Sequence, residues 1–158
     1  MTPEKMEKIA NAAAIHDIGK IAIPDVILLK PARFTNDEFE IMKTHTTVGE
    51  EIINSLSFIE DSEFFAYCHD ICTYHHERFD GNGYPEGLRG DEIPIAAQIV
   101  SVADAYDALV SERVYKCAYT KDEAFNKIMN GECGVFSPKI LKCFKVARVE
   151  FEKINSSS

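Results

Sequence analysis

The chain has 158 residues, 46% of them hydrophobic, which is enough for a single folded domain with a buried core. Its formal net charge of −9 argues against broad binding to DNA or RNA, because nucleic-acid phosphates attract basic surfaces. No apolar run approaches the ~20 residues of a membrane-spanning helix, and the N-terminus lacks a signal-peptide pattern. We therefore expect a cytoplasmic protein whose chain makes no membrane contact.

The chain is expected to begin with a helix followed by a loop. Residues 2–4 read Thr-Pro-Glu, the pattern of an N-cap, a proline at the first helical position and an early acid. This helix is predicted to continue to about Asp17, shortly before Gly19. Residues 21–31 are then predicted to form a loop that contains one short helical turn.

Capping signals mark several later helices. Thr35 and Glu38 have the spacing of a capping box, and they predict one helix that also carries His45 and Gly49. Further helices are predicted over residues 61–76 and 94–109, after the capping pair Thr120 and Glu123, and after Ser137-Pro138.

A long loop is predicted over residues 77–93, which contain four glycines and one proline. Loops of this length within a domain are usually functional. Period-2 alternation of apolar residues is almost absent, so the fold class is predicted to be all-α. Residues 1–155 are expected to form one domain, with residues 156–158 as a frayed tail.

Histidines and acidic residues suggest a metal site. The chain has five histidines, and four of them occur as His16 before Asp17, as His45, and as the adjacent pair His75-His76; the fifth, His69, has no motif and is predicted to be structural or exposed. Asp104 lies in an otherwise apolar helix, where burying its charge costs several kcal/mol unless a cation pairs with it. Imidazole and carboxylate ligands without thiolates favour a hydrolytic or redox-active transition metal over structural zinc.

Each of these features also has a structural interpretation. Asp17 is suited to cap a helix end beside an incidental histidine, and a single inward histidine such as His45 is more often a hydrogen-bonded core residue. The pair His75-His76 is equally compatible with an exposed helix C-terminus, where the helix dipole favours cations. Taken one at a time, the motifs leave these alternatives open.

Four segments together resemble the HD-GYP family: HDIGK (16–20), HTTVG (45–49), HHERFDGNGYPEGLRG (75–90) and IPIAAQIVSVADAYDALVSERVYK (93–116). The resemblance implies an HD-superfamily helical bundle with a long GYP loop (residues 77–93). It further implies a phosphodiesterase that hydrolyses cyclic di-GMP to linear pGpG, GMP or both. Two or three divalent ions are implied as cofactors, with iron or manganese first and zinc, nickel or magnesium as alternatives.

The resemblance also assigns roles by position. It makes Asp17 a bridging metal ligand and places Lys20 beside the leaving oxygen. The remaining metal ligands would be His16, His45, His75, His76 and Asp104. Substrate would be bound by Gly83, Tyr84 and Pro85 of the GYP loop and by the cations Arg113 and Lys116. The loop around Tyr84 would also face partners, including a diguanylate cyclase with a GGDEF domain.

One departure from the family concerns the N-terminal side. The family carries a further histidine ligand upstream of the HD pair, whereas the 15 residues before His16 contain no histidine. The chain therefore resembles a domain that lacks its upstream helix or helices. We expect weaker metal retention and an exposed apolar surface that favours a homodimer. The alternatives are a catalytically impaired module that binds ligand or a cyclase, and a hydrolase of the wider HD superfamily with another nucleotide substrate.

Overall fold

The computed structural model describes residues 1–56, 61–112 and 118–154, with side chains up to residue 148. Within these ranges it contains helices and two isolated β-bridges but no strand, so the predicted all-α class is confirmed. The elements are α1 (Pro3–Ala13), η1 (Ile18–Ala22), α2 (Asp25–Leu28), α3 (Asn36–Lys43), α4 (His45–Ser55), α5 (Ser62–Tyr74), η2 (Gly90–Glu92), α6 (Ile95–Val110), α7 (Lys121–Met129) and α8 (Pro138–Ile154). The predicted tail at residues 156–158 lies outside the described residues.

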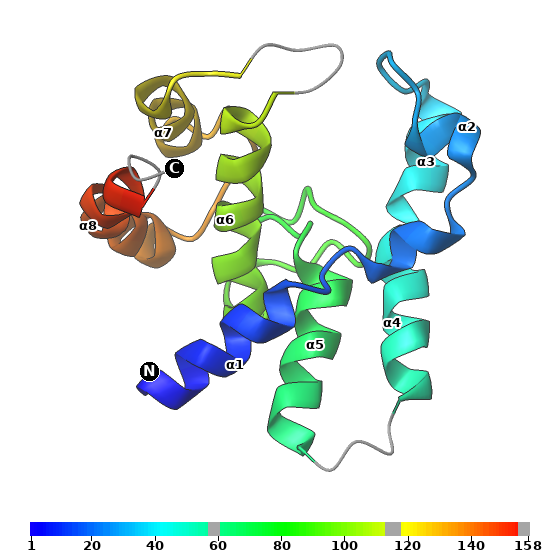
Figure 1. Ribbon diagram of the computed structural model, residues 1–158, viewed down its shortest axis with the longest axis horizontal. Helices are drawn as coiled ribbons and strands as arrows, with labels where there is room; N and C mark the ends of the chain where they lie inside the picture. Colours follow the sequence, from blue (N-terminus) through cyan, green and yellow to red (C-terminus); the bar gives the residue numbers. More distant parts are fainter. Residues whose placement is uncertain (57–60, 113–117, 155–158) are drawn as a thin grey trace.

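Two apolar cores meet at α6. In Figure 1, α5 lies between α1 and α4 and contacts α6, whose other side faces α7 and α8. The first core joins α1, α4, α5 and the start of α6, where Ala96 and Val100 are buried. The second core joins the rest of α6 to α7 and α8, with Val102, Tyr106 and Leu109 buried. None of the described helices combines the length and the apolar character needed to cross a membrane.

The first helix ends earlier than predicted. α1 stops at Ala13, and the amides of residues 14–16 bond to carbonyls three residues earlier instead of four. This tightening leads the chain out of the helix, and Asp17 has φ −100° and ψ 14°. The prediction of a helix to Asp17 is therefore wrong at its C-terminal end. As a result, His16 and Asp17 lie in a turn, where the 100° spacing of helical side chains does not separate them.

The single helix predicted through His45 is also wrong, because α3 and α4 are separate helices that meet at Thr44. The hydroxyl Oγ1 of Thr44 donates to the carbonyl of Ile41 at 2.7 Å, and its own amide donates to the same carbonyl at 3.1 Å. A side-chain hydroxyl that bonds locally competes with the regular helical pattern. The break makes His45 the first residue of α4.

Helix α7 has the capping box that the sequence predicts. Replacing Thr120 with alanine is expected to lower the free energy of unfolding by about 1 kcal/mol. The reason is that Oγ1 of Thr120 accepts from the amide of Glu123 at 3.3 Å, while Glu123 accepts from the amide of Thr120 at 2.9 Å. Urea unfolding followed by circular dichroism measures the loss. Thr120→Ser keeps the hydroxyl, and an equal loss in that variant would contradict the capping role.

Candidate metal centre

The turn between α1 and η1 brings His16 and Asp17 into one site. The Nδ1 atom of His16 lies 2.7 Å from the carbonyl oxygen of Ala13, which fixes the ring. The opposite nitrogen, Nε2, lies 3.2 Å from Oδ2 of Asp17. Lys20, one turn later in η1, places its Nζ 2.5 Å from the same carboxylate oxygen. The site is therefore organised around the Asp17 carboxylate.

Two histidines from other helices are held in the same manner as His16. Nδ1 of His45 lies 2.7 Å from the Met42 carbonyl, and Nδ1 of His75 lies 2.8 Å from the Ile71 carbonyl. A carbonyl oxygen only accepts, so each Nδ1 carries the proton. In the neutral ring the lone pair is then on Nε2. This is the tautomer in which metal-binding histidines are commonly fixed by their backbone partners.

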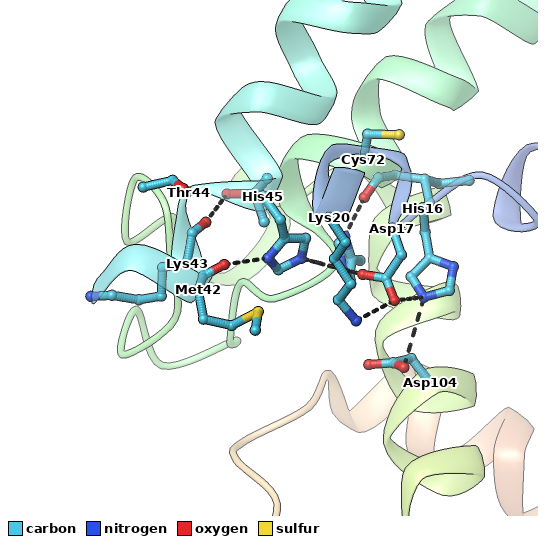
Figure 2. A network of polar contacts seen from close by, with 12 residues as sticks. His16, Asp17, Lys20, Met42, Lys43, Thr44, His45, Cys72 and Asp104 are labelled. Atoms are coloured by element: carbon cyan, nitrogen blue, oxygen red, sulfur yellow. Dashed lines mark hydrogen bonds and ion pairs between the residues drawn. The ribbon is translucent and has the colours of Figure 1, made fainter. Parts of the chain in front are cut away.

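The two oxygens of Asp17 face different groups. Oδ1 lies 3.4 Å from Nε2 of His45 and 3.8 Å from Nε2 of His75, and these two nitrogens are 3.4 Å apart. Oδ2 faces His16 and Lys20. Figure 2 shows the Asp17 carboxylate between His45 and His16, with Lys20 extending alongside it. A carboxylate with this arrangement has the geometry to contact two separate cations.

Burial controls the charge state of the histidines. His45 and His75 are 1% and 0% exposed, and burial lowers the pKa of His75 to about 3. The pKa values of His45 and His76 are also lowered, again mainly by burial, so all three rings are neutral at pH 7. Burial would raise the pKa of Asp17, but hydrogen bonds with His16 and Lys20 outweigh it and hold that pKa below its ordinary value. The same pairing with Asp17 raises the pKa of His16. The neutral rings of His45, His75 and His76 beside an ionised carboxylate are in the state that metal binding requires.

The contacts of Asp17 Oδ1 fit a bound cation. Oδ1 is buried and receives no hydrogen bond from the described residues, although it faces two imidazole lone pairs. A buried carboxylate oxygen in such surroundings is costly unless a positive charge lies between the groups. One ligand atom from each of Asp17, His45, His75 and His76 lies within 4.8 Å of the other three. This set, called here the His/Asp cluster, offers nitrogen and oxygen ligands of the kind that transition metals accept.

Asp104 lies at the other side of His16. Its Oδ1 is 3.9 Å from Nε2 of His16, and α6 supplies it from the opposite wall of the site (Figure 2). Burial raises the pKa of Asp104, against the opposing effect of His16. The structure thus brings Asp104 to the Oδ2 side of Asp17, where a second ion would lie. Its role as a ligand stays a prediction.

The GYP loop covers the site from the side of His76. The ring of Tyr84 stacks on the His76 ring, with centroids 4.7 Å apart and an angle of 29° between the planes. Phe39 of α3 contacts the Tyr84 ring edge-on at 6.1 Å, and Nζ of Lys43 lies 5.8 Å from its centre. Pro85 follows through a cis peptide bond. Tyr84 therefore forms part of the wall beside the His/Asp cluster.

Two residues of this region escaped the sequence interpretation, namely Glu77 and Arg78. Glu77 is 2% exposed, and the guanidinium of Arg78 donates to the carbonyl of Cys133 at 3.3 Å and to Oγ of Ser101 at 2.8 Å. Arg78 thereby joins the end of α5 to α6 and to the segment before α8. A charged pair in a glycine-rich loop normally indicates solvent exposure, so the only available signal was its position directly after the two histidines.

Two of the predicted cations cannot be placed. Arg113 and Lys116 lie outside the described residues, and their substrate role stays a prediction. His69 lies outside the His/Asp cluster and pairs with Glu50 at 3.2 Å, which agrees with the structural role predicted for it.

Comparisons with known proteins place this geometry in a family. The HD domain family matches residues 1–139. The chain is 47% identical over 137 residues to a cyclic di-GMP phosphodiesterase of Thermotoga maritima, covering 87% of this chain and 36% of the relative. It is 38% identical over 155 residues to a cyclic di-GMP phosphodiesterase of Vibrio cholerae, covering 98% of this chain and 32% of the relative. The chain thus spans about a third of the length of these relatives.

A solved structure has the same fold. It is Bd1817, described as an HDG"Y"P protein from Bdellovibrio bacteriovorus, with a TM-score of 0.68 and 23% sequence identity. The match covers 90% of this chain and 43% of that one. The predicted helical bundle is confirmed by this likeness. With the matched family and the motifs at residues 16–20 and 75–90, the chain belongs to the HD domain family, in its HD-GYP group.

Proposed function

We propose that this chain is the catalytic domain of a metal-dependent phosphodiesterase that hydrolyses cyclic di-GMP to linear pGpG, GMP or both. The observation that carries the proposal is the convergence of His16, His45 and His75, each through Nε2, on the two oxygens of Asp17. The relatives named as cyclic di-GMP phosphodiesterases support the substrate.

The metal would be held by the His/Asp cluster, with His16 and Asp104 on the Oδ2 side of Asp17. We propose two or three divalent ions, with iron or manganese preferred and zinc, nickel or magnesium as alternatives. When bound, such ions polarise phosphoryl oxygens and supply a nucleophile from water at neutral pH. Asp17 would bridge two ions, because its oxygens face separate sets of histidines.

The side chains around the ions would bind and orient the substrate. Lys20 is fixed against Asp17 Oδ2, and its remaining N–H groups are available to a phosphate oxygen or to the departing 3′ oxygen. Tyr84 offers an aromatic surface on the His76 side of the site, with Gly83 and Pro85 setting the path of the backbone around it. Arg113 and Lys116 are proposed to hold a phosphate, as bidentate and point-charge donors respectively. A GGDEF-domain partner and a homodimer stay predictions.

Metal analysis tests the proposed site. Protein purified without chelator is expected to contain iron or manganese in more than trace amounts, measured by inductively coupled plasma mass spectrometry. His75→Ala is expected to lower metal content about tenfold or more, because it removes a fully buried ligand. His69→Ala is the matched control, since His69 pairs with Glu50 outside the cluster.

Two results of the metal analysis would count against this assignment. Protein that is free of metal after such a purification, and that also fails to take up added iron or manganese, would exclude the His/Asp cluster as a metal centre. Equal metal loss in His69→Ala and His75→Ala would indicate a general effect of histidine removal. Hydrolysis of cyclic di-GMP by metal-loaded protein, with product identified by chromatography, then tests the reaction itself.

A further inference from the structure

Glu77 is a buried carboxylate with no part in the proposed chemistry. It follows His76 directly, and only 2% of its surface is exposed. Its Oε1 accepts two backbone hydrogen bonds, from the amide of Glu86 at 2.8 Å and from the amide of Gly87 at 3.0 Å. Buried carboxylates are rare unless donors compensate them, and hydrogen bonds to a charged acceptor are among the stronger ones. The two donors directly follow Tyr84 and Pro85.

The same part of the loop is attached at two further points. The amide of Tyr84 donates to the carbonyl of His76 at 3.3 Å. Gly83 packs directly on the backbone of residues 77 and 78, where an added Cβ would lie 2.3 Å from the Arg78 nitrogen and 2.4 Å from the Glu77 Cα. The loop therefore returns to the residues that follow the histidine pair. The Glu77 side chain fixes this part of the loop by accepting hydrogen bonds from the amides of Glu86 and Gly87.

We propose that Glu77 is a positioning residue, which fixes residues 83–87 so that the Tyr84 ring stays stacked on His76. Without the carboxylate, two backbone N–H groups of the loop lose their acceptor, and the loop is released toward solvent. Glu77 acts through Tyr84 and touches neither the substrate nor the ions. The effect on the reaction rests on the proposed function, whereas the effect on the loop does not.

The contacts distinguish this role from metal ligation. Oε1 is occupied by two amide donors, and Glu77 is not among the residues whose ligand atoms converge in the His/Asp cluster. The second oxygen, Oε2, is buried and receives no hydrogen bond from the described residues, but it is not one of the ligand atoms that converge in the cluster. Removal of Glu77 should therefore change the loop and leave the metal content unaltered.

Two substitutions of similar size distinguish the effect of losing the hydrogen-bond acceptor from the effect of changing the side-chain shape. Glu77→Gln keeps one carbonyl oxygen that accepts from both amides, whereas Glu77→Met keeps the length and removes every acceptor. Hydrogen–deuterium exchange, read by mass spectrometry on peptides that span residues 81–90, is expected to be about tenfold faster or more in Glu77→Met. Glu77→Gln is expected to remain close to the unmodified protein. Glu86→Ala is the control, since among the described residues its side chain bonds only to Tyr74, while its amide still reaches Glu77.

Kinetics and metal content complete the test. Glu77→Met is expected to raise KM for cyclic di-GMP about tenfold through the displaced Tyr84, with metal content unchanged and with Glu77→Gln near the original KM. Loss of metal in Glu77→Met would overturn the positioning role in favour of a structural or ligand role. Protected loop amides in Glu77→Met, or equally fast exchange in Glu77→Gln, would overturn it as well.

The hydrogen–deuterium exchange result does not depend on the proposed hydrolysis of cyclic di-GMP. If the unmodified protein hydrolyses no cyclic dinucleotide while the exchange pattern is as expected, the proposed function fails and the positioning of the loop by Glu77 is supported. If Glu77→Met does not fold, Glu77→Asp is used as the test variant instead. Aspartate keeps the carboxyl group, but its side chain is one methylene too short to reach both amides. Unchanged exchange in a folded Glu77→Asp protein would then overturn the proposal.

Discussion

Asp17→Asn is expected to abolish detectable hydrolysis of cyclic di-GMP, a loss of about 10³-fold or more, while the helical content stays unchanged. The amide removes the negative charge that faces His45 and His75 on one side and His16 and Lys20 on the other. It also replaces one of the two oxygens that would bridge two ions. Chromatographic quantification of linear product, with metal-loaded protein, measures the loss.

Asp25→Asn is the matched control for this change. Asp25 lies in the first turn of α2 and is exposed, so the same chemical replacement there should leave turnover within about twofold of the original. Circular dichroism establishes that both variants are folded. Unchanged turnover in Asp17→Asn would exclude the bridging role, and an equal loss in Asp25→Asn would show that the assay reports general charge loss.

Gly19→Ala is expected to lower the free energy of unfolding by about 3 kcal/mol or more, the upper range for overpacking. Gly19 of η1 packs against α4, where an added Cβ would lie 2.0 Å from the His45 carbonyl oxygen and 2.5 Å from the Gly49 nitrogen. Both atoms are backbone, so the two elements must separate. For a chain of this size the loss corresponds to a fall in melting temperature of about 10 °C, measurable by thermal unfolding.

The opposing glycine supplies the control. An added Cβ at Gly49 would have its nearest neighbour, Cβ of Cys72, at 3.5 Å, which is ordinary contact. Because alanine favours the helix over glycine, Gly49→Ala is expected to be neutral or stabilising by up to about 1 kcal/mol. Equal melting temperatures for the two variants would refute close packing at Gly19. Separation of η1 from α4 would also move Asp17 away from His45, so Gly19→Ala should lose metal as well.

The fold was largely predictable because its helix boundaries are coded locally. The hydroxyls of Thr35 and Thr120 and the carboxylate of Asp61 each accept from an amide three residues later. These signals need no knowledge of the tertiary structure. The early end of α1 and the break at Thr44 were missed, because both come from a shift to i−3 hydrogen bonding that leaves no mark in the apolar periodicity.

The site was predictable in its residue types but not in its arrangement. The HD and HH pairs stand out because histidine is rare in this chain, and the structure brings them together with His45. The orientation of the His16, His45 and His75 rings depends on a backbone carbonyl three or four residues earlier, such as that of Met42 for His45. Glu77 was missed because its donors are backbone amides nine and ten residues away, which no side-chain pattern records.

The shared position of α6 has a consequence for how the molecule loses its structure. One stretch of this helix closes the apolar interior of α1, α4 and α5, and the next stretch closes that of α7 and α8. Neither apolar core can unfold fully without exposing a buried face of α6, so the stabilities of the two cores are thermodynamically coupled. Asp104 projects from this shared helix, so the geometry of the proposed metal site would be sensitive to damage in α7 and α8, which supply none of its proposed ligands.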